Sequence, residues 1–348
     1  MRAPTRSLAR MPRRRSRSTW PVVVAAPDKF RGTASADEVC DAVRRAADRC
    51  GWECVRHPLA DGGEGTLDAL GGPNRTTVVS GPLGDPVEAP WRYSSGSAVI
   101  EMARASGLAV LAPGERNDPV AASTYGTGEL IAAAAEAGAK RIVVAVGGSA
   151  TTDGGLGALR ALNLARLTGI ELVVACDVDI PFVAAAEVFA PQKGASPAQV
   201  ELLTRRLERL VQVYREEYGV DVSELPGAGA AGGLAGGLAA IGARLESGFE
   251  LVSDEVALFD DVERAALVVT GEGYLDEESF HGKVVGGVIE GTEELGIPVL
   301  VVAGDIDPHL ERAVEAVSLA QRFGHERAMT ETLECIEAVV EEHLRSLG

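Results

Sequence analysis

Short runs of β-branched and other apolar residues alternate along the chain with segments of helical periodicity. Four of these runs are almost free of polar positions, as is typical of strands that are covered on both faces of a sheet. They are residues 21–26 (PVVVAA), 141–146 (RIVVAV), 171–176 (ELVVAC) and 298–303 (PVLVVA). Shorter strands are predicted at residues 76–80, 98–102 and 267–270.

Helices are predicted between the strands. Residues 35–50 place Val39, Val43 and Ala46 on one face, and Ser35 with Glu38 three residues later is typical of a capping box. Further helices are predicted at residues 127–137, 156–162, 197–218 and 330–346. Strands separated by helices indicate an α/β fold with a mostly parallel sheet, and such sheets place ligands in the loops that follow the strands.

The composition suits a globular protein of one large or two ordinary domains. The chain has 348 residues, of which 46% are hydrophobic and 24% are charged. No apolar run approaches the roughly 18 residues that a membrane-spanning helix needs, so we expect no membrane partner. The five cysteines include no C-x-x-C pair and are expected to be reduced thiols.

Charge is distributed unevenly. The first 19 residues contain seven arginines and no acid, so the total charge of −18 leaves −25 for the remainder. A body this acidic repels phosphate groups, and we therefore expect no nucleic-acid partner and a cytoplasmic location. Residues 1–19 are predicted to form a disordered basic extension; a targeting peptide and a translation start at Met11 or later are the alternatives.

The first candidate functional residues follow the strand predicted at residues 21–26. Asp28, Lys29 and Arg31 lie in the segment APDKFRG. Charged side chains between a strand and a helix can hold an anionic substrate and a metal–phosphate group. The alternative is a solvated turn, which the buried segments on both sides disfavour.

A second group is the segment DGGEG, in which Asp61 and Glu64 flank Gly62 and Gly63. The glycines allow the backbone to approach a ligand closely, and the carboxylates can bind Mg²⁺ or act as a base. A glycine-rich turn with incidental acids is the alternative, and the density of acids argues against it.

The third group, residues 146–155 (VGGSATTDGG), joins a predicted strand to a predicted helix. Its free backbone N–H groups, its hydroxyls and the start of the helix suit a phosphate cradle. Asp153 is a candidate for Mg²⁺ binding or for accepting the proton of a substrate hydroxyl. The other candidates in this group are Gly147, Gly148, Ser149, Thr151 and Gly154.

Two common nucleotide-binding motifs are excluded. No G-x-x-x-x-G-K-[ST] segment is present, so the chain has no Walker A loop. Residues 227–233 (GAGAAGG) match G-x-G-x-x-G, but no strand is predicted before them. We instead expect a glycine loop that opens an Ala- and Gly-rich helix near a ligand.

The last group follows the strand predicted at residues 267–270. It contains Glu272 in the segment TGEGYLD, followed by His281 and Lys283. Lys283 can reach a phosphate, and His281 either orients a substrate or is structural. A lesser polar group follows residues 171–176 and consists of Asp177, Asp179, Gln192 and Lys193.

Eight ordered motifs together resemble the bacterial glycerate kinase family of the type that has neither a P-loop nor an actin-like fold. They are APDKFRG, PLADGGEGT, GGSATTDGG, ACDVD, FAPQKGA, PGAGAAGG, TGEG and HGK, and the likeness extends from about Pro21 to Asp307. The resemblance implies transfer of the γ-phosphate of ATP to D-glycerate with Mg²⁺. The usual product in the family is 2-phosphoglycerate, with 3-phosphoglycerate as the alternative.

The resemblance also implies two α/β domains with mostly parallel sheets and an active-site cleft between them. Residues 20–80 and 285–348 would form the first domain, and residues 81–284 the second, inserted domain. Such an enzyme is expected to be a monomer or a homodimer.

The resemblance and the motif chemistry together suggest roles for the charged residues. Arg31 and Lys283 are expected to neutralise the glycerate carboxylate or the transferring phosphoryl group. Asp61 and Asp153 are both candidates for Mg²⁺ coordination and for accepting the hydroxyl proton, and the sequence does not divide these roles. Asp28 and Glu272 complete the acidic set.

The chain departs from the family pattern in three ways. Lys29 stands where the family has Ser, and Tyr274 stands where the family tends to have Arg. The connections after Leu162 and Asp179 are shorter than in the family, which predicts that one wall of the cleft is more open. A kinase of a different small hydroxy acid, or a non-catalytic metabolite-binding descendant, is therefore the alternative function.

Overall fold

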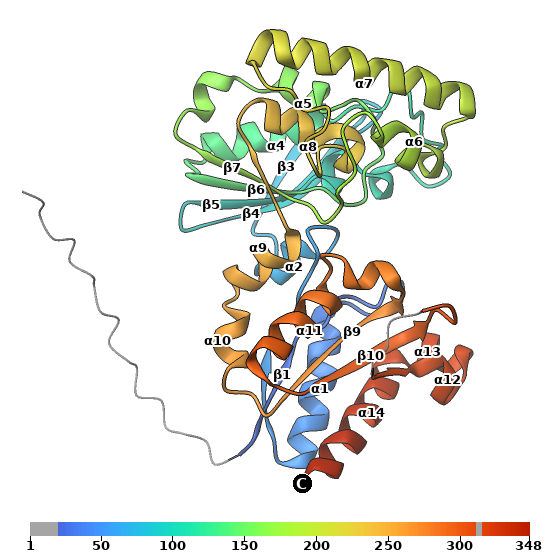
Figure 1. The fold of residues 1–348 in the computed structure, drawn as a ribbon. Coiled ribbons are helices and arrows are strands. Elements are labelled where there is room, and N and C mark those ends of the chain that lie inside the picture. Colours follow the sequence, from blue (N-terminus) through green and yellow to red (C-terminus); the bar gives the residue numbers. More distant parts are fainter. Residues whose placement is uncertain (1–19, 311–314) are drawn as a thin grey trace, which may run out of the picture.

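The computed structural model describes residues 20–310 and 315–348, which form two α/β units, each built around one sheet (Figure 1). This arrangement confirms the predicted fold class of α/β with mostly parallel sheets. The predicted basic extension at residues 1–19 lies outside the described residues. Within the described part of the chain, no helix is both long and apolar enough to cross a membrane.

The first sheet has five parallel strands in the order β11-β10-β9-β1-β2. Its strands are β1 (Val22–Ala25), β2 (Glu53–Arg56), β9 (Leu267–Leu275), β10 (Val299–Ile306) and β11 (Ala316–Ser318). One face packs against α1 (Ala36–Cys50) and α14 (Thr332–Leu347), and the other against α10 (Leu258–Val262) and α11 (Val284–Leu295). Both faces of β1 are therefore covered, which explains its uninterrupted apolar sequence.

The second sheet has six strands in the order β3-β4-β5-β6-β7-β8. They are β3 (Arg75–Ser80), β4 (Pro86–Ser94), β5 (Ser97–Glu101), β6 (Arg141–Ala145), β7 (Glu171–Ala175) and β8 (Arg244–Glu246). The pairs β3/β4 and β4/β5 are antiparallel, and β5 to β8 are parallel. One face is covered by α4 (Tyr125–Glu136), α5 (Leu156–Ala161), α7 (Pro197–Tyr218) and α8 (Ala230–Ala240).

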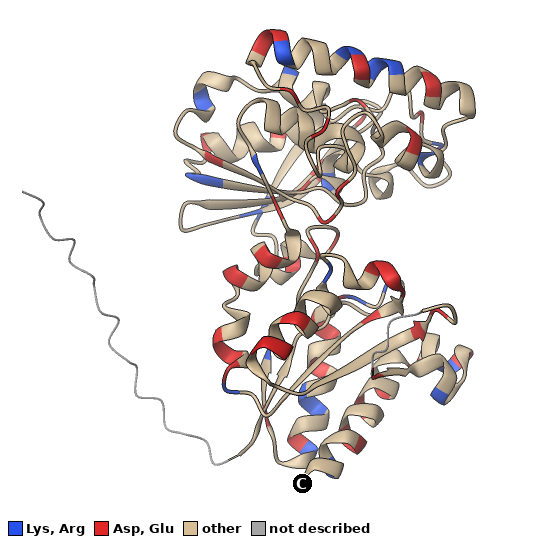
Figure 2. Cartoon of the chain, in the orientation of Figure 1, with Lys and Arg blue, Asp and Glu red and all other residues tan. Residues whose placement is uncertain are grey.

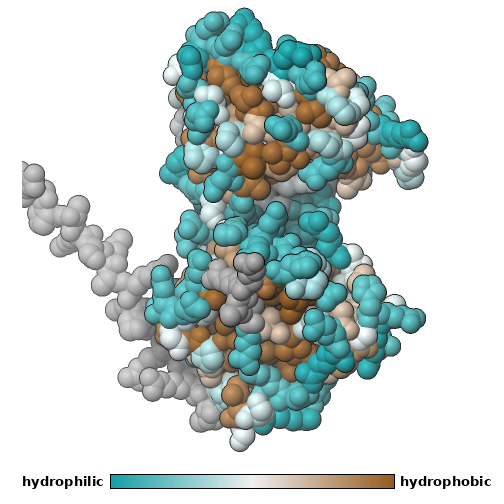
Figure 3. Space-filling model, turned by 45° about the vertical axis from the view of Figure 1, so that its right-hand side comes forward, coloured by the Kyte–Doolittle hydropathy of each residue, from teal (hydrophilic) through white to brown (hydrophobic). Residues whose placement is uncertain are grey.

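The other face of the second sheet packs toward the first unit. One apolar cluster contains Val24 and Val268 of the first sheet together with Val143 and Val173 of the second. Helix α9 (Gly248–Glu255) contributes Phe249 to this shared cluster. The surface around the narrowing between the two units is mainly hydrophilic (Figure 3), so the contact between the units combines an apolar interior with a polar rim.

The remaining helices are short. They are α2 (Thr66–Ala69), α3 (Ala103–Ser106), α6 (Ala185–Phe189), α12 (Leu319–Phe323) and α13 (His325–Thr330). Acidic residues follow one another along α9, α10 and α11 (Figure 2), where they contribute to the negative charge of the body.

The predicted helices at residues 35–50 and 197–218 form as α1 and α7. The capping box is present, because Ser35 N donates to Glu38 at 2.8 Å and Glu38 N donates to Ser35 Oγ at 3.3 Å. All five cysteines are free thiols, as predicted. β9 is longer than predicted: its pairing with β10 continues to Leu275, so the segment TGEGYL is strand and not loop.

Sheet membership differs from the predicted domain boundaries at residues 80/81 and 284/285. β3 pairs with β4 and belongs to the second sheet, although it precedes residue 81. β9 pairs with both β1 and β10 and belongs to the first sheet, although it precedes residue 285. We therefore propose boundaries just before β3 and after β8, where the chain passes from one sheet to the other.

Backbone contacts between glycines hold the units together beside the shared cluster. Val146 N, just after β6, donates to Gly62 O at 3.0 Å. A Cβ atom on Gly147 would lie 2.5 Å from Gly63 Cα, and one on Gly248 would lie 2.2 Å from Asp61 O. These distances are too short for any side chain, so the close approach requires glycine at Gly147 and Gly248.

We predict that Gly248→Ala lowers the free energy of unfolding by about 2–3 kcal/mol, because the new methyl group meets backbone atoms that cannot rotate away. The measurement is urea denaturation followed by circular dichroism. Gly296→Ala is the control: Gly296 has a φ of 69° and no neighbouring atom within 4 Å of a Cβ, so it tests backbone strain alone. We expect Gly296→Ala to lower the free energy of unfolding by about 1 kcal/mol. Equal losses of stability in the two variants would contradict the steric argument.

Candidate active site

A cleft of about 620 Å³ lies between the two units, where strands of both sheets end. Residues 61–64 after β2, 146–149 after β6 and 176–178 after β7 line it. The segment at residues 230–231, at the start of α8, also lines the cleft. The size of the cleft is that of a small-molecule site.

A smaller pocket of about 370 Å³ opens beside this cleft. Its lining includes Asp28, Glu272, Tyr274, Asp276 and Glu278, from the loop after β1 and from β9 with the segment that follows it. Tyr274, which departs from the family pattern, is 48% exposed at this pocket.

Four residues line both the cleft and the smaller pocket: Lys29, Arg31, Asp61 and Lys283. We call these four residues the junction. Lys29 Nζ lies 3.6 Å from the Asp28 carboxylate, and Lys283 Nζ lies 3.5 Å from Glu278. Arg31 forms no ion pair within the described residues and is exposed, so its charge is available to an anionic ligand.

Three further carboxylates, Asp28, Asp177 and Glu272, lie around Asp61 of the junction. Burial raises the pKa of Asp28 to about 6 although Lys29 opposes the shift, and the charge of Asp61 adds to it. Burial and then the charge of Asp61 raise the pKa of Asp177 to about 8. Burial, with a contribution from the charge of Asp28, raises the pKa of Glu272 to about 7. These acids therefore lie close enough to repel one another, and cations offset only part of the repulsion.

The same carboxylates have unused oxygen atoms. Asp177 Oδ1 accepts hydrogen bonds from Gly248 N at 2.7 Å and from Ser247 Oγ at 3.3 Å. Asp177 Oδ2 and Glu272 Oε1, in contrast, are buried without a hydrogen-bond partner in the described chain. Buried oxygens of this kind are costly unless a ligand satisfies them, so the acidic set fits a bound cation.

Within residues 20–310 and 315–348, no three His, Cys, Asp or Glu side chains form a group that could hold a metal ion by themselves. Mg²⁺ in phosphotransferases is commonly bound through one or two carboxylates, waters and the phosphate oxygens of the substrate. The oxygen donors at the junction fit Mg²⁺ in kind, although they do not form a closed cage.

The loop of the predicted phosphate cradle divides into two parts. Gly147, Gly148 and Ser149 line the cleft, as predicted. Thr151 is fully buried, and a Cβ atom on Gly154 would lie 2.6 Å from a methyl carbon of Leu210. Thr151 and Gly154 therefore lie below the cleft and line none of the cavities described here.

Asp153 lines none of the three cavities, and its hydrogen bonds favour a structural role over the predicted role as magnesium ligand or base. Its carboxylate accepts hydrogen bonds from Thr124 N at 2.8 Å, Thr124 Oγ1 at 2.9 Å, Gly155 N at 3.1 Å and Gly157 N at 3.2 Å. These donors use both oxygens and join the start of α4 to the start of α5. Asp153 is a structural carboxylate because its hydrogen bonds leave no oxygen for a substrate.

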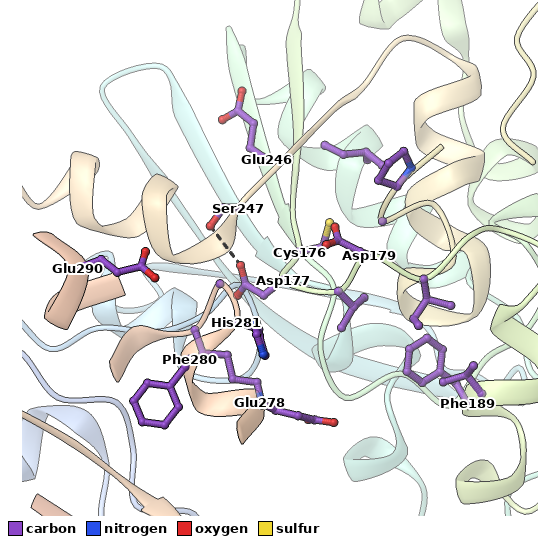
Figure 4. A pocket seen from close by; sticks show the side chains of 18 residues that line it. Cys176, Asp177, Asp179, Phe189, Glu246, Ser247, Glu278, Phe280, His281 and Glu290 are labelled. Atoms are coloured by element: carbon purple, nitrogen blue, oxygen red, sulfur yellow. Dashed lines mark hydrogen bonds and ion pairs between the residues drawn. The ribbon is translucent and has the colours of Figure 1, made fainter. Parts of the chain in front are cut away.

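His281 lines a third cavity of about 780 Å³, which we call the outer pocket (Figure 4). The outer pocket adjoins the cleft, with which it shares Asp177, Phe189 and Lys283. Apolar side chains form part of its wall: Val178, Ile180, Val188, Phe189 and Leu245. Figure 4 shows Asp177 between Ser247 and His281, with Asp179 on the neighbouring segment.

The two shortened connections lie in different places. The connection after Leu162, which includes a short 3-10 helix (Leu164–Leu167), leads to the amino end of β7, opposite the cleft. Residues 162–170 line none of the three cavities. The prediction of a more open cleft wall therefore gains no support at the first connection, whereas Asp179 and Ile180 of the second connection line the outer pocket.

Two buried charged side chains near the cleft have roles that the sequence did not reveal. Glu101 at the end of β5 is 2% exposed and accepts hydrogen bonds from Gly65 N and Leu67 N, each at 2.9 Å. The acid at the end of an apolar strand was a usable signal for it. Lys193 belongs to the lesser polar group that the sequence predicts after residues 171–176. In the structure it lies beneath the loop of Ser149.

The chain was compared with known proteins and families. The profile of the Glycerate kinase family matches residues 23–168 and 163–347. A glycerate kinase of Halalkalibacterium halodurans is 36% identical over 374 residues, covering 94% of this chain and 97% of that protein. The glycerate 2-kinase of Escherichia coli is 39% identical, covering 82% and 85% of the two chains.

A solved structure supports the same relationship. A candidate glycerate kinase 2 from Salmonella typhimurium LT2 superimposes with a TM-score of 0.81 at 34% identity, covering 94% of this chain and 98% of that one. The two matched segments of the family profile overlap at residues 163–168, within the shortened connection to β7.

We predict that Asp177→Asn stabilises the protein at pH 8 in magnesium-free buffer. Since the pKa of Asp177 is raised to about 8 on folding, the folded state holds more protons than the unfolded state from about pH 4 to pH 8. The contribution of Asp177 to stability is therefore present at low pH and is lost as pH rises toward 8. Asparagine cannot ionise, so the variant does not lose this stability. We expect a gain of about 2 kcal/mol at pH 8 that disappears toward pH 4.

Urea denaturation at pH 4, 6 and 8 measures this difference. Asp85→Asn, in the exposed turn between β3 and β4, is the matched control and should follow the parent at each pH. A lower stability of Asp177→Asn at pH 8 would show that this carboxylate is not destabilising in the folded protein.

Proposed function

Since the chain belongs to the glycerate kinase family, we propose that it transfers the γ-phosphoryl group of ATP to D-glycerate with Mg²⁺. The observation that carries this proposal is the junction. Three cations and one carboxylate lie where a cleft with a glycine loop meets a pocket of small-molecule size. In-line phosphoryl transfer depends mainly on positioning and on charge neutralisation, and the junction offers both.

We place ATP in the cleft and the outer pocket. The backbone of Gly147, Gly148 and Ser149 would hold the phosphate oxygens. The apolar wall formed by Val178, Val188 and Phe189 suits the flat face of a base, and Asp179 lies beside it for ribose hydroxyls. The two cavities share Lys283, whose charge would lie near the phosphates.

We place glycerate in the smaller pocket. Arg31 is the free cation for its carboxylate, and Asp28 and Glu272 are the acids nearest its hydroxyl groups. With pKa values raised to about 6 and about 7, these two acids titrate near neutral pH, which suits a group that takes the hydroxyl proton. They replace Asp153 in this role.

Asp61, with Asp177 beside it, would hold Mg²⁺ at the junction, because Asp61 lines both cavities and Asp177 has an unpartnered oxygen. When bound, the ion offsets the negative charge of the phosphate oxygens. Lys29, Arg31 and Lys283 provide further positive charge from the protein itself. Transfer to the 2-hydroxyl is the proposed outcome, in line with the name of the Escherichia coli relative.

A second candidate acceptor follows from two residues of the smaller pocket. Lys29 is paired with Asp28 where the family has Ser, and Tyr274 stands exposed where the family tends to have Arg. Either change alters the recognition of the acid, so a related 2-hydroxy acid is the alternative acceptor. The cytoplasmic location and the monomeric or dimeric state stay predictions from the sequence.

The first experiment is an ADP-release assay with ATP, Mg²⁺ and D-glycerate, in which phosphorus NMR identifies the product. We expect turnover and a 2-phosphoglycerate signal. A panel of other 2-hydroxy acids is measured in parallel. Turnover of another acid with none of D-glycerate would favour the second candidate, and no turnover with any acid by folded protein would contradict the kinase proposal.

We predict that Asp61→Asn lowers kcat by about 100- to 1,000-fold without loss of stability, because it removes charge at the point of transfer. Asp153→Asn is expected to affect stability, because the NH₂ group of asparagine would face backbone N–H donors. We expect its free energy of unfolding to fall by about 2 kcal/mol. Kinetics and urea denaturation are measured for both variants, with Asp85→Asn as control. Near-normal kcat in Asp61→Asn would remove Asp61 from the mechanism.

A further inference from the structure

A buried lysine lies directly beneath the glycine loop of the cleft. Lys193 is 4% exposed, and its Nζ donates to Ser149 Oγ at 2.7 Å and to Thr151 O at 2.6 Å. It ends the short 3-10 helix η3 (Pro191–Lys193). Neither bond involves an acid, and Lys193 forms no ion pair within the described residues.

A second contact fixes the same loop to η3. Asn117 Nδ2 donates to Ala150 O and to Lys193 O, each at 2.9 Å. Residues 149–151 are therefore held at three successive positions by Lys193 and Asn117. A loop restrained in this way keeps its geometry before a ligand arrives, which lowers the cost of binding.

The position of Lys193 also gives it an electrostatic role. Lys193, Gly147, Gly148 and Ser149 line the same cleft, so the ammonium group lies under the surface that a phosphate would contact. Of its three N–H groups, two donate within the protein, and one remains for a ligand. A buried cation without a counter-ion is unfavourable, and an anion in the loop would supply the missing charge.

We propose that Lys193 is a positioning residue of the phosphate site, which fixes Ser149 and Thr151 and supplies the buried positive charge that attracts the anion. This inference rests on the proposed placement of the ATP phosphates on residues 147–149. Lys193 lies outside the junction and is an additional residue of that phosphate site. We also expect anion binding and protonation of Lys193 to favour one another.

The surroundings of Lys193 set the direction of this coupling. Burial lowers the pKa of Lys193 to about 7, and Asp153, beneath the same loop, opposes the shift. Across the cleft lie the acids Asp61, Glu64 and Asp177 and the cations Lys29, Arg31 and Lys283. Since the charged amine favours an anion, anion affinity should fall as pH rises above about 7.

Sulfate is a suitable probe, because its charge does not change between pH 7 and pH 9. Calorimetric titration of the parent should show a Kd for sulfate that rises with pH, by at most about tenfold per pH unit. Lys193→Met removes the charge with a side chain that is one atom shorter. We expect sulfate affinity at least about tenfold weaker at pH 7 in this variant, with a smaller pH dependence than in the parent, to which Asp177 still contributes.

Lys140→Met, at an exposed lysine before β6, is the matched control and should keep the affinity and pH dependence of the parent. Steady-state kinetics provide a second readout. Lys193→Met should raise KM for ATP and leave KM for D-glycerate unchanged, whereas general damage to the fold would raise both. Unchanged sulfate affinity in Lys193→Met, or no sulfate binding by the parent, would overturn the inference.

If Lys193→Met does not fold, the parent alone tests the inference. Titration with sulfate at pH 8 in two buffers of different protonation enthalpy measures proton uptake, and we expect a substantial fraction of one proton per bound anion. Absence of proton uptake would overturn the coupling. Turnover of ATP and D-glycerate by the parent tests the proposed function separately, so failure of one is distinguishable from failure of the other.

Discussion

The candidate site depends on a contact between backbones that no side chain can replace. The loop of Asp61 extends from the first sheet and lies against the ends of β6 and β7. There Gly62 O accepts a hydrogen bond from Val146 N at 3.0 Å. A Cβ atom on Gly62 would lie 2.9 Å from the carbonyl group of Ala175. Because Cβ atoms on Gly62, Gly147 and Gly248 would all meet backbone atoms, only glycines at these positions let the Asp61 carboxylate lie between the two units. The motif DGGEG is therefore needed for the two units to pack together, and this packing brings Asp61 to the candidate site.

The assembly brings acids together at a cost in stability. The pKa values of Asp28, Asp177 and Glu272 are raised mainly by burial, and the charges of neighbouring acids add to each shift. In the folded protein alone this repulsion is destabilising, whereas a bound cation and the surrounding basic residues would reduce it. Lys193 shows the opposite case, a buried amine with a lowered pKa beneath the loop. Unsatisfied charges of both signs at one cleft are typical of a site that its ligands complete.

The sequence predicted the parts of the fold that local pattern controls. Apolar runs located β1, β6, β7 and β10, and the Ser35–Glu38 pair located the start of α1. Four strands were missed: β2, β8 and β11 have only three or four residues each, and β4 contains two prolines. The length of β9 was missed because glycines and acids continue a strand only when a neighbour pairs with it. The role of Asp153 was difficult to predict for a similar reason. A carboxylate among glycines fits a ligand site and a structural cap equally well, and only the N–H donors around it decide.

The edges of the sheets explain why a shortened chain can keep its site. In a parallel sheet, the carboxyl ends of the strands carry the ligands and the amino ends carry only connections. The shortened segment at residues 162–170 enters β7 at its amino end, and none of its residues lines the three cavities. The second shortened segment follows the carboxyl end of β7 and lines the outer pocket through Asp179 and Ile180. Loss of residues at the first place is expected to matter less for the site. Loss at the second changes the shape of the proposed nucleotide pocket, and any functional difference from the family should appear there and at Lys29 and Tyr274.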